Sequence, residues 1–133
     1  MERAKGKIES YRDLTVWQKA VDLVESCYKL SSLLPREEKY GLASQIQRAA
    51  VSVPANIAEG FGRRNIGEYI HHLLMANGSL KELETHLIVA GRIGQLTSKA
   101  VQPVMDQAEE IGRMLSGLIA SLERVRSQRS QKS

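Results

Sequence analysis

The segment from Gly41 to Arg64 restricts the possible folds of this chain more than any other. It reads GLASQIQRAAVSVPANIAEGFGRR, so many of its side chains are small and its apolar residues recur at helical spacing. Small side chains let the backbone of a neighbouring helix come close, and Pro54, which has no N–H, removes a backbone hydrogen bond and bends the helix. The segment therefore predicts a close-packed helix that is kinked at Pro54.

The composition favours one helical domain. A chain of 133 residues is long enough for a single ordinary domain with a buried core. Aromatic residues make up only 5% of it, whereas 42% of the residues are hydrophobic, so the core is expected to be aliphatic and rich in alanine. These proportions predict an all-α fold.

Apolar residues at alternating spacings of three and four mark successive helices. The segments run from about Asp13 to Leu34, from between Pro35 and Leu42 to about Gly60, from Asn65 to Gly94, and from Thr97 to Leu122. Asp13, Asn65 and Thr97 are suitable N-caps. The connections are short and force neighbouring helices to run antiparallel, which predicts an up-down-up-down four-helix bundle.

The first segment has an unusually wide apolar face, because Val16, Leu23 and Leu30 flank its seam. A wide face predicts contact with more than one neighbour. The seam itself comprises Trp17, Ala20, Val24, Cys27, Ser31 and Leu34.

The positive charge lies at the ends of the chain. The net charge is +4, to which residues 1–12 contribute +2 and residues 124–133 contribute +4, so residues 13–123 carry about −2. This distribution predicts a flexible basic N-terminal segment over 1–12, a bundle domain over 13–123 and a flexible basic C-terminal tail over 124–133.

The remaining composition predicts a cytoplasmic location. Cys27 is the only cysteine, so no internal disulfide is possible and a reducing compartment is expected. In a helical seam its thiol is expected to be a small buried hydrophobe. No stretch approaches the roughly 20 apolar residues of a membrane-spanning helix, and the N-terminus lacks the apolar core of a signal peptide. No membrane partner is expected.

The sequence holds little that points to catalysis, and no cofactor is expected. Glu68 and His71 have the Glu-x-x-His spacing of bundle metal sites, but the pair is single and faces away from the predicted seam, so no metal site is predicted. Arg64 and His71 fit the Arg-x4-6-His spacing of some metal-independent helical ribonucleases, in which histidine moves protons and arginine holds phosphate. Chance matches to so loose a pattern are common, so the ribonuclease stays a lesser alternative. His72 and His86 are no stronger candidates for a catalytic histidine.

Other polar and aromatic positions have two open interpretations. Trp17 is either part of the core, which the seam position favours, or a platform on which a base stacks. Asn77 and Glu84 share one helical position beside the third seam. They either specify register and contact a second subunit, or lie partly exposed at the bundle edge.

Three segments carry a family resemblance. They are DLTVWQKAVDL, YGLASQIQRAAVSVPANIAEGFGR and ANGSLKELETHLIVAGRIGQL. Together they closely resemble the bacterial four-helix-bundle proteins encoded in intervening sequences of 23S ribosomal RNA genes. The likeness extends from about Asp13 to Leu122, and PANIAEGFGR is its most specific part.

The resemblance implies a left-handed bundle that assembles into a ring-like homo-oligomer, a pentamer. It also implies kinship with the accessory protein of diversity-generating retroelements, which binds a reverse transcriptase and nucleic acid. It implies no catalytic residues. Nucleic-acid contact is carried onto Arg48, Arg63 and Arg64, whereas Gln47 stands where the family pattern has another basic residue.

These observations lead to a main hypothesis and an alternative. The main one is a non-enzymatic homo-oligomer that contacts RNA or an RNA-handling protein through its arginines and tails. The alternative is a protein-binding scaffold, such as a reverse-transcriptase accessory protein, that recruits its partner on the wide face of the first helix.

Overall fold

The computed structural model describes residues 7–132 of the chain, and this part is all-helical with no strand. Its long elements are α1 (Thr15–Ser31), α2 (Leu42–Phe61), α3 (Ile66–Arg92) and α4 (Ser98–Lys132). Short 3-10 turns, η1 (Tyr11–Asp13) and η2 (Arg36–Glu38), precede α1 and α2. The predicted all-α fold is confirmed.

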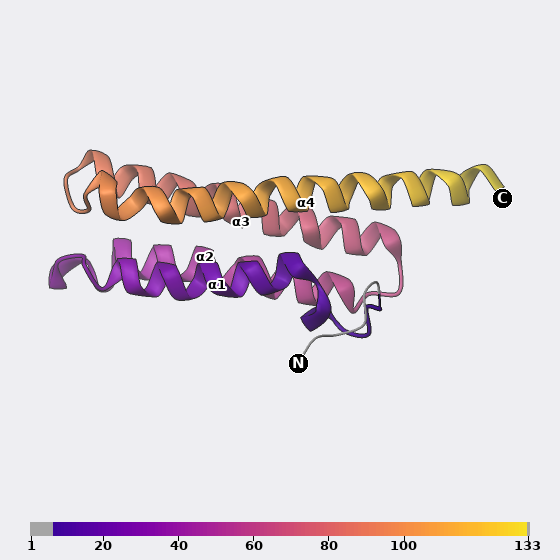
Figure 1. Ribbon diagram of the computed structural model, residues 1–133, viewed down its shortest axis with the longest axis horizontal. Coiled ribbons are helices and arrows are strands. Elements are labelled where there is room, and N and C mark those ends of the chain that lie inside the picture. Colours follow the sequence, from indigo (N-terminus) through magenta and orange to yellow (C-terminus); the bar gives the residue numbers. More distant parts are fainter. Residues whose placement is uncertain (1–6, 133) are drawn as a thin grey trace.

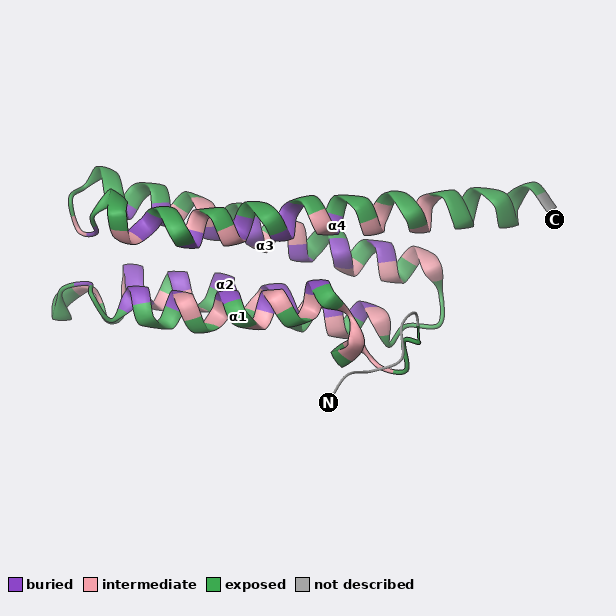
Figure 2. Cartoon of the chain, in the orientation of Figure 1, coloured by how far each residue is buried: buried purple, intermediate pink, exposed green. Residues whose placement is uncertain are grey.

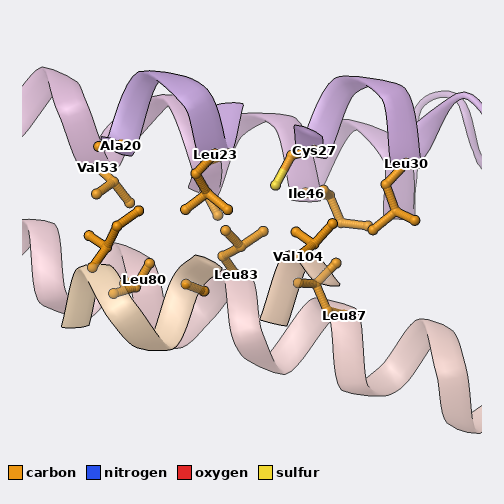
Figure 3. Packing of buried hydrophobic residues seen from close by; sticks show 14 of the residues in the cluster. Ala20, Leu23, Cys27, Leu30, Ile46, Val53, Leu80, Leu83, Leu87 and Val104 are labelled. Carbon is orange, nitrogen blue, oxygen red and sulfur yellow. The ribbon is translucent and has the colours of Figure 1, made fainter. Parts of the chain in front are cut away.

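The four helices form a bundle in which each packs against the next in chain order, and α4 closes the ring against α1 (Figure 1). Their buried sides face inward (Figure 2). Leu23 and Cys27 of α1 point toward Leu83 of α3 and Val104 of α4 (Figure 3). The residues of α3 that the heptad pattern assigns to its seam are buried, apart from the half-buried Tyr69 at its start: Leu73, Ala76, Leu80, Leu83, Leu87 and Ala90.

The wide apolar face of α1 lies mostly inside the bundle. Val16, Leu23 and Leu30, which the sequence pattern places beside the seam, are buried, whereas Trp17 and Val24 are only half-buried. The seam of α1 is thus rotated toward the flanking residues, because α1 has to fill the angle between α2 and α4. This face is not a free docking surface.

The first helix begins near the predicted position, at Thr15, but its predicted cap is wrong. Asp13 does not cap α1; its carboxylate accepts from the backbone N–H of Ser10 at 3.1 Å, while the Ser10 hydroxyl accepts from Arg12 N. This reciprocal capping box closes η1, and α1 begins only at Thr15. Residues 10–12, which the sequence analysis assigns to a flexible segment, are therefore part of this turn, whereas residues 1–6 lie outside the described residues.

The first helix also ends earlier than expected, at Ser31 instead of Leu34. The hydroxyl of Ser31 donates back to Tyr28 O, and Pro35 then forces extended backbone before η2. Helix α2 continues through Pro54 to Phe61. The kink at Pro54 and the left-handed twist of the bundle stay predictions.

The caps of the later helices are confirmed. Asn65 Oδ1 accepts from Glu68 N at 3.1 Å and starts α3, and Thr97 Oγ1 accepts from Ala100 N at 3.1 Å before α4. Gly94 has φ +76°, the left-handed conformation that ends α3.

Helix α4 is longer than the bundle. It continues through residues 124–132, which the sequence analysis assigns to a flexible tail, and projects beyond the α2–α3 connection (Figure 1). No glycine or proline interrupts this stretch, and Arg126 pairs with Glu123 one turn earlier at 2.7 Å, so local propensity favours continuing the helix. None of the described helices is long and apolar enough to cross a membrane.

The small residues of the opening segment bring α2 and α3 close together. A Cβ added to the buried Gly60 would lie 2.7 Å from His72 Cβ and 3.2 Å from the backbone oxygen of Tyr69. Non-bonded carbon atoms do not approach so closely, so only glycine allows this crossing. The close packing expected from the sequence is confirmed at this position.

We expect Gly60→Ala to lower the free energy of unfolding by about 1–3 kcal/mol, because the methyl group must separate two packed helices. Gly117→Ala in α4 is the matched control, since a Cβ there has nothing within 4 Å. It should raise stability by about 0.5–1 kcal/mol. Urea denaturation followed by circular dichroism measures both, and equal effects of the two variants would contradict a close crossing at Gly60.

Cys27 is fully buried, and burial raises the pKa of its thiol to about 12. The reactive thiolate is therefore scarce at any pH below this value. We expect Ellman's reagent to leave Cys27 unmodified at pH 8 in the folded protein and to react with it once urea unfolds the chain. Fast modification of the folded protein would show that the packing of α1 on the other helices does not bury the thiol.

Candidate nucleic-acid interface

The structure divides the predicted arginines between two places. Arg63 and Arg64 follow the C-terminal end of α2, whereas Arg48 lies in its middle. Fifteen residues separate Arg48 from Arg63, which corresponds to roughly 22 Å along a helix axis. These arginines therefore do not form one patch on the described chain.

Arg63 is paired with an acidic side chain of its own helix. Its Nη2 lies 2.8 Å from Glu59 Oε1, and both side chains are about half exposed. Pairing at this spacing is worth only a few tenths of a kcal/mol on a surface, roughly 0.3–0.5. Arg63 thus has a carboxylate beside it, which offsets its attraction for phosphate.

A polar seam runs from Glu59 along the contact between α2 and α3. Ser52 Oγ lies 2.8 Å from Ser79 Oγ, and Asn56 Nδ2 donates to both the carbonyl and the hydroxyl of Ser52. The ring of His72 reaches this seam, with Nδ1 at 3.4 Å from Asn56 Oδ1 and Nε2 at 4.0 Å from Glu59 Oε1. The polar groups of this seam therefore hold α2 and α3 together.

Arg64 is exposed and forms no ion pair or hydrogen bond within residues 7–132. Arg126 of α4 comes near the same end of the bundle, because its Nη1 would lie 3.5 Å from a Cβ placed on Gly67 in the first turn of α3. Arg126 is not among the candidate residues predicted from the sequence, because residues 124–133 are expected to form a flexible tail. Only the continuation of α4 brings it over α3.

Arg48 is exposed on α2 and likewise has no partner within the described chain. It lines a hollow between α1 and α2 with a volume of 450 Å³, together with Tyr28, Ser44, Gln47, Val51 and Ser52. Gln47, which stands where the family pattern has a basic residue, donates from Nε2 to Ser31 Oγ at 3.0 Å. The side chain at 47 therefore ties α2 to α1.

The residues of the ribonuclease alternative are not brought together. His71 is exposed on α3, and its ring packs against that of His72 at a centroid distance of 5.8 Å. No hydrogen bond or ion pair joins His71 to Arg64 in the described part of the chain. Glu68 is also exposed, and no group of three His, Cys, Asp or Glu side chains suited to a metal occurs among the described residues.

The sequence leaves two interpretations open for Trp17, Asn77 and Glu84, and the surroundings of each side chain bear on the choice. Trp17 packs against the core, with its ring 5.1 Å from that of Tyr11 in an edge-to-face contact. Asn77 and Glu84 line a polar hollow of 460 Å³ between α3 and α4, and Lys81 Nζ lies 3.4 Å from Glu84 Oε2. The two residues thus lie at the edge of the bundle.

The outer side of α3 has two groups of exposed apolar side chains. Leu74 and Met75 lie in its first half, and Ile88 and Val89 lie near its end, followed by Ile93 just after it, with exposures of 41–56%. The charged Lys81 and Glu82 are exposed between the two groups. Clustered apolar side chains left in solvent commonly mark a contact surface. The sequence pattern predicts a partner-binding apolar surface on the first helix. On α3 the signal for such a surface is the presence of apolar residues at positions outside its heptad seam.

The fold and these surfaces define an all-α, four-helix-bundle protein with exposed guanidinium groups and an uncovered apolar helix face. The family model described as 23S rRNA-intervening sequence protein matches residues 12–117, and the chain belongs to this family. A search of curated proteins finds no match.

A solved structure has the same fold. It is a protein of unknown function from Bacteroides thetaiotaomicron, of the S23 ribosomal protein family, with a TM-score of 0.74 and 24% identity. The alignment covers 79% of this chain and 98% of that one. At this identity the likeness establishes the fold alone.

Proposed function

We propose that this chain is a non-enzymatic homo-oligomeric bundle that contacts RNA. The observation that carries the RNA contact is the state of Arg48 and Arg64, two exposed guanidinium groups without a partner in the described chain. Guanidinium groups bind phosphate oxygens in bidentate fashion, and free ones need not first break an ion pair. Membership of a family named for 23S rRNA intervening sequences supports this proposal.

The binding is expected to be electrostatic and therefore sensitive to salt. Each phosphate that a cation neutralises releases counterions, which lowers the logarithm of affinity by roughly 0.7–0.9 for each tenfold rise in salt. The chain between the basic ends carries about −2, so contacts have to come from local groups of cations and not from a general attraction.

We expect Arg48→Gln and Arg64→Gln each to weaken binding of a stem-loop RNA and to reduce the salt slope by roughly 0.7–0.9. Lys19→Gln is the matched control, because it also removes one positive charge but Lys19 Nζ is already paired with Glu110 Oε1 at 3.1 Å. Fluorescence anisotropy at several salt concentrations measures both quantities. If the unaltered protein binds no RNA at low salt, or binds equally at low and moderate salt, the RNA proposal is wrong.

Self-association is supported by the apolar outer side of α3. Large uncovered apolar surfaces on small proteins are usually contact surfaces, and burying such side chains contributes about 25 cal/mol per Å². The resemblance implies a ring-like homo-oligomer, a pentamer, so the proposed occupant of this face is a second copy of the chain.

We expect the double variant Met75→Glu with Val89→Glu to dissociate the oligomer, because it places charges in the proposed contact. Light scattering coupled to size exclusion should then give the monomer mass of 14.8 kDa, against a multiple of it for the unaltered protein. Leu33→Glu is the control, since Leu33 is also exposed, at 63%, but lies in the α1–α2 connection.

The same measurement tests the alternative of a scaffold for another protein, which the apolar face of α3 also favours. A mass of 14.8 kDa for the unaltered protein would contradict the homo-oligomer and leave this face for a different partner. Recovery of a protein partner after nuclease treatment would then separate a scaffold from an RNA-bridged complex.

A further inference from the structure

We propose that single-stranded RNA binds along the outer groove between α1 and α2, with bases stacked on Tyr28 and Tyr40. This inference rests on the proposed RNA contact and names the form of RNA and its site. The groove consists of the hollow beside Arg48 and a second hollow of 590 Å³ that reaches the α1–α2 connection. The two share Tyr28, Ser44 and Gln47, so they form one continuous surface.

The aromatic residues of the chain provide the first argument. It has six of them, and four pair within the fold: Tyr11 with Trp17 at 5.1 Å, and Phe61 with Tyr69 at 6.0 Å. The two that have no aromatic partner, Tyr28 and Tyr40, both line this groove. They are 47% and 87% exposed, which leaves ring surface free for a base.

Charge provides the second argument. Arg36, Lys39 and Arg48 line the two hollows, and no carboxylate is among their lining residues. Lys39 Nζ lies 5.4 Å from the centre of the Tyr40 ring, so a base stacked there has an ammonium group close to its phosphate. Glu37 and Glu38 stand between Arg36 and Lys39 in the sequence but do not line either hollow, so the charged side chains that line the groove are cations.

Exposed tyrosines beside cations favour single-stranded RNA over a duplex. Free aromatic rings are useful only to bases that are themselves unstacked, as in loops and single strands, whereas a duplex hides its base faces. Cations along the groove hold the backbone while the tyrosines hold the bases. A purely electrostatic duplex site has no need of exposed tyrosines.

The groove also has polar groups for base edges. Gln47 is fixed by its Nε2 bond to Ser31 Oγ, and its Oε1 remains free to accept from a base amino group. Ser44 adds a hydroxyl on the same wall. Glutamine at position 47 thus gives the groove an uncharged polar group, whereas an arginine there would add a positive charge.

The test compares a fluorescein-labelled oligouridylate with a blunt-ended RNA duplex that has neither loop nor tail. We expect the oligouridylate to bind more tightly, and Tyr28→Ala and Tyr40→Ala each to weaken its binding about tenfold while leaving duplex binding unchanged. Leu33→Ala is the matched control, since this exposed side chain is in the same connection but does not line either hollow. Circular dichroism checks that each variant is folded.

A second measurement locates the strand without any variant. Photocrosslinking of a 4-thiouridine oligomer, followed by mass spectrometry, should place adducts on peptides that contain Tyr28 or Tyr40. Adducts confined to the arginines at the α2–α3 end would overturn the groove site.

The outcomes separate this inference from the function on which it rests. If the protein binds RNA but the tyrosine variants bind oligouridylate as well as Leu33→Ala does, the groove inference is wrong and the RNA proposal stands. If the protein binds neither RNA, both fail. Binding of a purified acidic protein that the tyrosine variants lose, without RNA binding, would show that the groove serves a protein instead.

Discussion

The close crossing of α2 and α3 at Gly60 is the contact on which the remaining architecture depends. The two backbones approach there without an intervening side chain, since even a methyl group would lie 2.7 Å from His72 Cβ. The serine pair at Ser52 and Ser79 fixes the same two helices further along, at 2.8 Å. With these helices fixed as a pair, α1 and α4 close the bundle on the other side around the apolar core.

This pairing also decides which surfaces stay open. Polar groups of α2 and α3 satisfy one another along the seam, so Arg63 and His72 are occupied by contacts within the fold. Arg48 lies outside the seam, toward α1, and remains unpaired. The proposed RNA contacts are therefore made by cations that take no part in the packing of the helices. The proposed self-association surface is the apolar side of α3, which no helix of the same chain covers.

The sequence predicts much of the fold and little of the site. Heptad spacing identifies the buried side of α3, and Asn65 and Thr97 identify two helix starts, because these signals act within a few residues. The predicted cap of α1 is wrong, because the Asp13 carboxylate accepts from the backbone N–H groups of Glu9 and Ser10 instead. The groove of Tyr28 and Tyr40 could not be predicted, because it exists only after α1 packs on α2, and Arg126 reaches α3 only through the added turns of α4.

Because of those added turns, α4 has one part that the core stabilises and one part that it does not. Up to Leu122 the helix has core contacts, but residues 124–131 are all exposed. These residues lie outside the core, so opening their backbone hydrogen bonds costs far less free energy than opening the bundle. Amide exchange should therefore fall from solvent-like rates to globally protected ones within two or so turns near Leu122.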